Sequence, residues 1–421
     1  LLPHLTVSEN IAMPSNDIVR HGIYDWKKSD ALAAEALSRL GSTTADISPH
    51  DIVSELRPDQ MQMVEIARAV GQNAKIILLD EPTSSLNFEE TEKLFESIRG
   101  LCNAGIGIIF VSHRMNEVRE LSDRITILRD GVVIVDGVPM SEKTDEEIVS
   151  DMLGEKLNAE EKKRKDSNAF ESSAEVLSIS FDGYDGELTV KEGEIVGLAG
   201  LAGSGRSSVL RTIWGTKPRS DIHLRYLGEE YKPKNPMHAL KKKIAYISED
   251  RSESGLFFGQ PIKETVLMAH RNLQRKLLVK NKSEDKLLGQ IIGEVQIKVP
   301  THECMPEALS GGNQQKLLFG RWITDEAKLL LLDEPTRGVD IKTKHEIYQR
   351  VRKMVEANNA GALVVSSELE ELVLMCDKVL IIRDGHVEDV LTGDRITENN
   401  MMAEITASGK TKQQTEDNKS V

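Results

Sequence analysis

The sequence predicts an α/β fold that occurs twice, in tandem, along one chain. The string LLDEPT begins at Leu78 and again at Leu331, 253 residues later. Two further pairs of segments, 111–113 with 365–367 and 129–131 with 383–385, keep an offset of 254 residues. A shared offset over several motifs indicates an internal repeat. Short apolar runs that alternate with helical patterns predict the fold class, because this alternation is typical of a parallel sheet covered by helices.

The predicted strands are short apolar runs that end in polar motif residues. They occupy residues 76–79, 106–111, 195–198, 329–332 and 362–365. Apolar residues at helical spacing predict helices over 31–40, 60–70, 88–101, 208–214 and 315–322. Each copy ends in a predicted hairpin, over 125–135 and 379–390, because Asp-Gly favours tight turns between strands. The charged helical segment 272–299 predicts a helical subdomain inserted in the second copy.

The repeat also sets the predicted domain boundaries. The first copy spans residues 1–153, a polar linker 154–173, the second copy 174–405 and a disordered tail 406–421. The second copy has a glycine-rich loop from Gly200, and an offset of 253 places the counterpart of this loop before residue 1. We therefore expect the first copy to be incomplete and the chain, which begins with Leu1, to be truncated at its N-terminus.

Composition excludes several classes of protein. The chain has 54 basic and 68 acidic residues, a formal net charge of −14, which argues against a general nucleic-acid-binding surface. We expect no nucleic-acid partner. Its three cysteines stand far apart without metal-ligand spacing, as in reduced cytosolic proteins. No run approaches 18 apolar residues, so a role at a membrane requires other chains.

The glycine-rich loop of the second copy is a candidate phosphate-binding site. It lies between a predicted strand and a predicted helix, where backbone N–H groups can surround phosphate oxygens. Its candidate binding residues are Gly200, Gly203, Ser204, Gly205, Arg206 and Ser207. Arg206 stands where such loops usually carry lysine, and its planar guanidinium need not reach the same oxygens. Ser207 is a candidate magnesium ligand.

Acidic pairs end one predicted strand in each copy. Asp80 and Asp333 are candidate magnesium ligands, and Glu81 and Glu334 are candidate catalytic residues that orient or deprotonate an attacking water. A single Asp-Glu-Pro sequence is equally consistent with a turn that ends a strand. Its occurrence in both copies at the same offset favours the catalytic interpretation.

His113 is a third catalytic candidate. It follows the predicted strand 106–111, where its imidazole can hydrogen-bond a terminal phosphate beside Glu81. The equivalent residue of the second copy is Ser367.

The segment LSGGNQQ at 309–315 opens a predicted helix. Ser310, Gly311, Gly312 and Asn313 combine a hydroxyl, a flexible backbone and a helix N-terminus, which together can bind a phosphate. In the first copy the corresponding segment, 56–62, carries Arg57 in place of the serine and also Asp59, whose charge is unfavourable near a triphosphate.

Together these motifs resemble the nucleotide-binding subunits of ABC transporters over nearly the whole chain. The loop GLAGSGRS, the EDR segment 249–251 and LSGGNQQK at 309–316 resemble, more narrowly, the ATPases of bacterial simple-sugar importers of the ribose and galactose type. LTVSEN at 5–10 is also similar to a segment of that family. The resemblance implies two tandem ABC-type P-loop NTPase domains. Each has a mainly parallel sheet with a helical subdomain, and the first is incomplete.

The resemblance also implies cofactors, partners and a division of labour. The cofactors are ATP and Mg²⁺, and the partners are transmembrane permease subunits and a periplasmic or extracellular solute-binding protein. The chain would lie peripherally on the cytoplasmic face of the inner or plasma membrane. Its halves would pack head to tail, with Asp80, Glu81 and His113 facing Ser310–Asn313 in a hydrolytic site. Arg206, Glu334 and Ser367 would face the altered segment 57–60 in a site that hydrolyses poorly.

Aromatic and D-loop roles follow from the same resemblance. Phe181 or Tyr184 would stack on adenine or, as an equal alternative, be packed in the core. Residues 85–87 and 338–340 resemble the loops that meet across such dimers.

The function expected is ATP hydrolysis coupled to import of a monosaccharide such as ribose, galactose or xylose. The alternatives are an importer ATPase for a nucleoside or an autoinducer-type sugar, and a soluble twin-domain ATPase that acts on ribosomes or DNA. We expect the chain as given to hydrolyse little ATP alone, because its first copy lacks a phosphate-binding loop.

Overall fold

The computed structural model describes residues 1–15, 18–20, 23–83, 86, 88–112, 114–129, 131–154, 170–182, 184–201, 203–251, 255–274, 281–297, 299, 301–323 and 327–407. The chain divides into two compact units, unit 1 from Leu1 to Lys156 and unit 2 from Leu157 to Val421. Most of the predicted linker and nearly all of the predicted tail lie outside the described residues.

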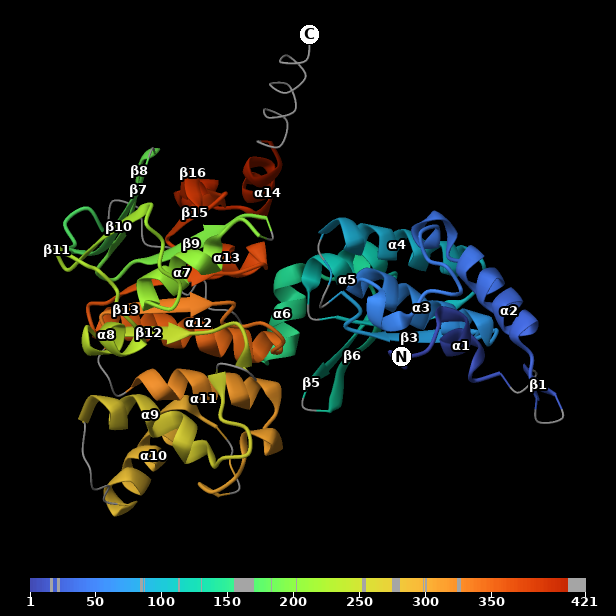
Figure 1. Ribbon diagram of the computed structural model, residues 1–421, viewed down its shortest axis with the longest axis horizontal. Coiled ribbons are helices and arrows are strands. Elements are labelled where there is room, and N and C mark those ends of the chain that lie inside the picture. The colour runs from blue at the N-terminus through green and yellow to red at the C-terminus, as the bar shows by residue number, and fades with distance from the viewer. Residues whose placement is uncertain are drawn as a thin grey trace, which may run out of the picture. The chain divides into compact units, whose positions relative to one another are not determined.

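A six-stranded sheet forms the centre of unit 2 (Figure 1). Its order is β12 (Ile244–Ile247), β13 (Leu329–Asp333), β14 (Gly361–Val365), β9 (Ile195–Ala199), β15 (Lys378–Arg383) and β16 (His386–Thr392). Only β16 runs antiparallel to its neighbour. Every residue of β9, β13 and β14 is buried, as the continuous apolar runs predict for strands covered on both faces.

Two layers cover this sheet. On one face lies a four-stranded antiparallel sheet in the order β11 (Glu229–Glu230), β10 (Ile222–Tyr226), β7 (Glu175–Phe181) and β8 (Tyr184–Lys191), together with α7 (Arg206–Trp214). On the other face α12 (Ile341–Ala357) and α13 (Leu369–Met375) pack through residues such as Val351 and Leu372. Unit 2 also contains α8 (Pro236–Lys241) and α14 (Glu398–Ala407).

A helical subdomain is inserted in unit 2, as the sequence predicts. It consists of α9 (Ile262–Gln274), α10 (Asn281–Val295) and α11 (Gly311–Ile323), which Figure 1 shows gathered below α12. Its core includes Val266, Leu288, Ile291 and Leu317. No helix among the described residues is long and apolar enough to cross a membrane.

Unit 1 repeats part of this plan. The strand β3 (Ile76–Asp80) pairs in parallel with β4 (Gly107–Val111), and β5 (Arg124–Arg129) pairs with β6 (Val132–Pro139) as the predicted hairpin. Its other described strands and α-helices are α1 (Val7–Ala12), β1 (Val19–Arg20), β2 (Ile23–Tyr24), α2 (Trp26–Ser38), α3 (Pro58–Gly71), α4 (Phe88–Asn103), α5 (Met115–Leu121) and α6 (Asp145–Leu153).

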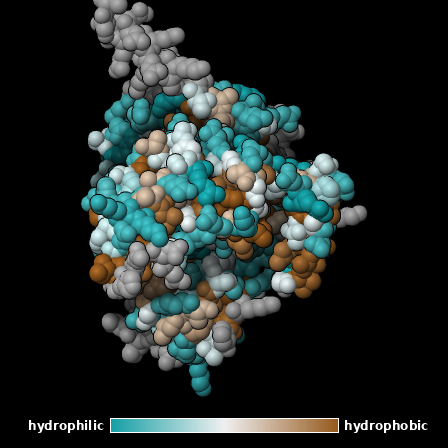
Figure 2. Space-filling view, turned by 90° about the vertical axis from the view of Figure 1, so that its right-hand side faces the viewer, coloured by the Kyte–Doolittle hydropathy of each residue, from teal (hydrophilic) through white to brown (hydrophobic). Residues whose placement is uncertain are grey.

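The prediction that strands are covered on both faces is wrong for β3 and β4. Ile77 and Leu79 are buried, whereas Ile76 is 60% and Leu78 71% exposed. The equivalent residues of β13, Leu329 and Leu331, are fully buried because β7, β8 and β10 cover that face. Those three strands have no counterpart among the described residues of unit 1. Apolar residues reach the surface elsewhere too, as the brown areas of Figure 2 show for one side of the molecule.

Candidate functional site

The glycine-rich loop of unit 2 joins β9 to α7 and is packed closely against the turn after β15. A Cβ atom on Gly200 would collide with the carbonyl oxygen of Ile382, and one on Gly205 would lie 2.9 Å from Cα of Gly385. The backbone N–H of Gly385 also donates to the carbonyl oxygen of Ser204, at 2.7 Å. Gly203 and Gly205 adopt positive φ angles of 81° and 94°, which L-residues rarely tolerate. The loop therefore requires glycine at these positions.

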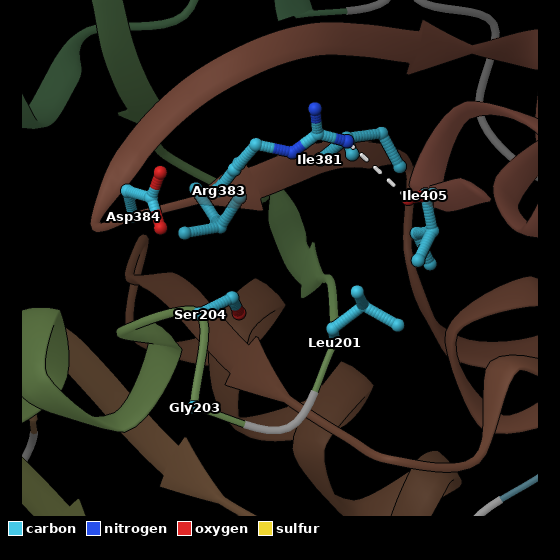
Figure 3. A pocket seen from close by; sticks show the side chains of 8 residues that line it. Leu201, Gly203, Ser204, Ile381, Arg383, Asp384 and Ile405 are labelled. Carbon is cyan, nitrogen blue, oxygen red and sulfur yellow. Dashed lines mark hydrogen bonds between the residues drawn. The ribbon is translucent and has the colours of Figure 1, made fainter. Parts of the chain in front are cut away.

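A pocket of about 160 Å³ lies between this loop, the end of β15 and α14 (Figure 3). Its lining residues are Leu201, Gly203, Ser204, Ile381, Ile382, Arg383, Asp384 and Ile405. The Ser204 hydroxyl is buried and has no hydrogen-bond partner within the described part of the chain. An unpartnered hydroxyl and a glycine backbone that excludes side chains fit a loop that binds phosphate.

The predicted magnesium ligands of unit 2 lie together. The hydroxyl of Ser207 donates to Oδ1 of Asp333 at 2.7 Å, and the phenol of Tyr246 donates to Oδ2 at 3.0 Å. Asp333 is fully buried, and burial raises the pKa of its carboxyl although both hydroxyl groups oppose that shift. A guanidinium nitrogen of Arg211 lies 3.8 Å from Oδ2.

These oxygen ligands suit Mg²⁺, which binds proteins through one or two side chains and completes its shell with water and substrate phosphates. No cluster of three or more His, Cys, Asp or Glu side chains that suits a metal occurs among the residues that the structure describes. One carboxylate and one hydroxyl are thus consistent with a magnesium ion shared with a nucleotide.

Glu334 is held in an uncommon backbone conformation at the end of β13. Its φ is 50°, and its N–H donates to the carbonyl oxygen of Val365 at 2.9 Å. Its Oε2 accepts two hydrogen bonds of 3.0 Å, from the backbone N–H and the hydroxyl of Ser367. Burial raises the pKa of this carboxyl, against the effect of Ser367 and the positive charge of Arg206.

Arg206 lies in the same cluster but is engaged by the protein itself. Its Nη1 donates to the carbonyl oxygen of Ser366 at 2.7 Å. Burial lowers the pKa of the guanidinium, which nevertheless stays charged because an arginine pKa begins far above neutrality. One guanidinium nitrogen of Arg206 is therefore hydrogen-bonded to the backbone, whereas the lysine that is usual at this position contacts phosphate.

The predicted phosphate-binding segment at the start of α11 consists of Ser310, Gly311, Gly312 and Asn313. Its neighbours are not the residues of the cluster around Asp333. The Arg251 guanidinium donates to the carbonyl oxygens of Gly311, at 2.9 Å, and Arg337, at 3.1 Å. A Cβ atom on Gly312 would lie 2.8 Å from Oγ1 of Thr343. Asn313 donates its N–H to the Ser310 hydroxyl at 3.5 Å. The glycines thus allow the helix start to approach α12 closely.

Unit 1 places its acidic pair in the same way. Asp80 ends β3 opposite Val111 of β4, and Glu81 has a φ of 45° with its N–H donating to the carbonyl oxygen of Val111 at 2.9 Å. His113, Ser85 and Asn87 lie outside the described residues. The backbone of Asp80 and Glu81 therefore repeats that of Asp333 and Glu334. The side chains differ in their surroundings, because Asp80 and Glu81 are exposed whereas Asp333 is buried. Residues 1–156 contain no glycine-rich loop.

The altered segment of unit 1 is stabilised by ion pairs. Arg57 precedes α3 and donates to both carboxylate oxygens of Asp59, at 3.1 and 3.0 Å, and to Asp46 at 3.1 Å. These contacts neutralise Asp59, and the two residues stand where unit 2 has the small residues Ser310 and Gly312. The structure thus supplies a partner for a carboxylate that the sequence alone left unpaired.

Several contributors were missed in the sequence. Tyr246, which contacts Asp333, lies in no motif that the sequence singled out. Arg251 lies in the EDR segment 249–251, but its contact with Gly311 was not predicted. Glu117 and Glu371 were also missed, although they are 254 residues apart and the repeat could have indicated them. Phe181 is only 3% exposed and belongs to the core cluster between the two sheets, so the packing alternative holds for it. The side chain of Tyr184 is outside the described set.

Comparisons with known proteins agree with this geometry. Residues 1–84 and 185–337 match the ABC transporter family. "Ribose import ATP-binding protein RbsA 1" of Streptomyces avermitilis is 37% identical over 405 residues, covering 96% of this chain and 76% of that protein. "Ribose import ATP-binding protein RbsA" of Geobacillus kaustophilus is 34% identical over 415 residues, covering 97% and 83%. The protein of the same name in Bacillus subtilis is 35% identical over 404 residues, covering 95% and 80%.

Among solved structures, a nucleotide-free ATP-binding cassette from an ABC transporter matches with a TM-score of 0.46 and 17% identity, over 54% of this chain and 95% of that chain. The assignment rests on the sequence matches. The matched segments contain the glycine-rich loop, both acidic pairs and the segment 309–315. The chain belongs to the ABC transporter family.

Proposed function

We propose that this chain is the ATP-binding and ATP-hydrolysing subunit of a bacterial ABC importer for a monosaccharide of the ribose, galactose or xylose kind. One observation carries the proposal. A protein named for ribose import is 37% identical over 96% of the chain. The cluster of Ser207, Asp333 and Glu334 supplies the oxygen ligands and carboxylate that ATP chemistry with magnesium uses.

Unit 2 supplies a nucleotide-binding set. The loop 200–205 would hold the phosphates of ATP through backbone N–H groups, and Ser207 with Asp333 would hold Mg²⁺. The ion would supply charge stabilisation for the transferred phosphoryl group. Glu334 is already hydrogen-bonded twice by Ser367, and Arg206 is bonded to the Ser366 carbonyl. These contacts support the proposal that the residues of unit 2 bind nucleotide but hydrolyse it slowly.

Hydrolysis is assigned to Glu81, with Asp80 as the magnesium ligand and His113 as the residue that contacts the terminal phosphate. Unit 2 has Ser367 at the position of His113. This supports a difference in hydrolysis between the two units, because a serine hydroxyl does not change its protonation state near neutral pH as an imidazole does.

The partners proposed are transmembrane permease subunits and a solute-binding protein outside the cytoplasmic membrane. Their presence would place the chain peripherally on the cytoplasmic face of that membrane. The relatives named for import support this arrangement.

Reconstitution of the full-length protein with its permease subunits tests the proposal. ATP hydrolysis should rise when ribose and the solute-binding protein are added, and a nucleoside or another furanose in place of ribose identifies the solute class. Hydrolysis that ignores the binding protein, in a chain that sediments with ribosomes, would contradict an importer.

A further inference from the structure

Each unit buries a glutamate that the site described above does not use. Glu117 lies on α5 and is 6% exposed, and Glu371 lies on α13 and is 2% exposed. They are 254 residues apart, the same offset that relates the segments beside them. A buried carboxylate is unfavourable unless hydrogen bonds compensate its lost hydration. Its partners therefore indicate what it does.

In unit 1 these partners are the two strand-end loops. Oε2 of Glu117 accepts hydrogen bonds from the hydroxyl of Thr83 at 2.8 Å and from the hydroxyl of Ser112 at 2.7 Å. Thr83 lies two residues after Glu81, and Ser112 directly follows β4 and precedes His113. One carboxylate oxygen thus ties the loop after β3 to the loop after β4.

Unit 2 contains the same link. The hydroxyl of Thr336 donates to Oε1 of Glu371 at 2.8 Å, and the Ser366 side chain also hydrogen-bonds this carboxyl. Ser366 is the residue whose carbonyl oxygen accepts from Arg206 and whose neighbour, Ser367, bonds Glu334. Recurrence in both units indicates a feature of the fold.

The link bears on the backbone of Glu81 and Glu334. Their φ angles of 45° and 50° lie in the left-handed region, which non-glycine residues adopt only when the surroundings enforce it. On the amino side, each N–H is held by a carbonyl oxygen, of Val111 or Val365. On the carboxyl side, the hydroxyl of Thr83 or Thr336, two residues further on, is held by the buried glutamate. In unit 2 the side chain of Gln315 also donates to the carbonyl oxygen of Pro335.

We propose that Glu117 is a positioning residue for ATP hydrolysis, which acts through Thr83 to hold Glu81 and through Ser112 to hold the start of the segment that carries His113. Glu371 has the equivalent role for Glu334. This inference rests on the proposed function, in which Glu81 acts on the attacking water.

The units differ in the residue that accompanies the buried glutamate. Nη1 of Arg114 donates to Oε1 of Glu117 at 3.1 Å and to the carbonyl oxygen of Thr83 at 3.4 Å. The residue equivalent to Arg114 in unit 2 is Glu368, which pairs with Lys344 of α12. The link is thus reinforced by a cation in the unit assigned to hydrolysis.

The test uses the full-length protein assembled with its permease subunits. Glu117→Ala should lower kcat by about 10- to 100-fold, because small displacements of a catalytic group have effects of that size. KM for ATP should change less than about twofold, since the partners that the structure describes for Glu117 are Thr83, Ser112 and Arg114, none of which belongs to the proposed nucleotide site. Glu117→Gln keeps an acceptor oxygen for Thr83 and Ser112 and should recover most of the lost kcat.

A matched control is Ser29→Ala. Ser29 is fully buried in unit 1, and its hydroxyl bonds the carbonyl oxygen of Ser8 at 3.2 Å and the hydroxyl of Tyr24 at 2.8 Å. Its loss should lower the thermal midpoint and leave kcat unchanged. If Glu117→Ala behaves in the same way, the glutamate is merely structural and the inference is overturned.

Two further variants keep the result decisive. If Glu117→Ala does not fold, Thr83→Val should lower kcat and Thr83→Ser should restore it, and equal kcat in both would overturn the inference. Glu81→Gln is measured in parallel. Hydrolysis that survives Glu81→Gln rejects the assignment of hydrolysis to Glu81, on which this inference rests, whereas loss with Glu81→Gln and normal kcat with Glu117→Ala rejects this inference alone.

Discussion

The hydroxyl of Ser207, at the start of α7, lies 2.7 Å from Oδ1 of Asp333, at the end of β13. This hydrogen bond joins the glycine-rich loop to the acidic strand end, 126 residues apart. In a buried setting the pair would offer magnesium two oxygen ligands close together, as proposed above. It is the contact that turns two separate motifs of unit 2 into one site.

The first prediction concerns this pair. Ser207→Ala or Asp333→Asn should weaken magnesium-dependent binding of ATP to the chain by at least about tenfold, equivalent to about 1.4 kcal/mol. Titration with a fluorescent ATP analogue measures the change. In EDTA the variants and the unaltered protein should bind equally. A defect of the same size without Mg²⁺ would show that the residues do not act as metal ligands.

The second prediction separates the two acidic pairs. In the full-length protein, Glu81→Gln should abolish ATP hydrolysis, because the amide cannot accept a proton from water, an effect of about 10²- to 10⁴-fold. Glu334→Gln should reduce the rate much less, since Ser367 already uses Glu334 as a hydrogen-bond acceptor. Phosphate release by assembled transporter measures both. The reverse ranking would show that the two sets are assigned the wrong way round.

The third prediction concerns Glu371. Burial raises the pKa of its carboxyl to about 7. The like charges of Glu368 and Glu334 act in the same direction, while Thr336 and Ser366 oppose it. The folded state therefore holds a proton that the unfolded chain releases near pH 4.5, the ordinary value. Stability should fall as pH rises through this window, by about 1.4 kcal/mol per pH unit, and stay level above it.

Glu371→Gln tests this dependence, because the amide resembles the protonated acid. Urea unfolding of unit 2 at several pH values should show the variant gaining stability over the unaltered chain between about pH 5 and 7. Tyr348 also lies close, and burial raises its pKa well above the usual value, so it stays neutral throughout. Two parallel stability curves would contradict the assignment of the proton to Glu371.

The fourth prediction concerns close packing at the start of α11. Gly312→Ala places a methyl group 2.8 Å from Oγ1 of Thr343, which is itself bonded to Asp340 at 2.8 Å. Overpacking of this kind typically costs about 1–3 kcal/mol. Gly293→Ala is the control, because this glycine of α10 has no atom within 4 Å of a Cβ, and alanine should stabilise the helix by up to about 1 kcal/mol. Equal effects would mean that Gly312 is not closely packed.

Much of the fold follows from local patterns of the sequence. The apolar runs at 76–79, 329–332 and 362–365 became strands, and the glycine-rich loop joined a strand to a helix, as predicted. Such features depend on neighbouring residues: side-chain periodicity, turn chemistry and glycine's access to positive φ. The repeat strengthened each of these predictions, because a motif that occurs in both copies at one offset is expected to adopt the same local structure in both.

By itself, the sequence determined the two-copy plan, the strand ends that carry Asp80 and Asp333, and the glycine-rich loop. Only the tertiary structure decided that Leu78 is exposed where Leu331 is buried, that Arg206 bonds the Ser366 carbonyl, and that Arg57 pairs with Asp59. It also decided that Glu371 holds its proton near neutral pH. Burial, ion pairing and pKa arise from groups far apart in the chain, and a linear pattern records which residues are present but not which of them meet.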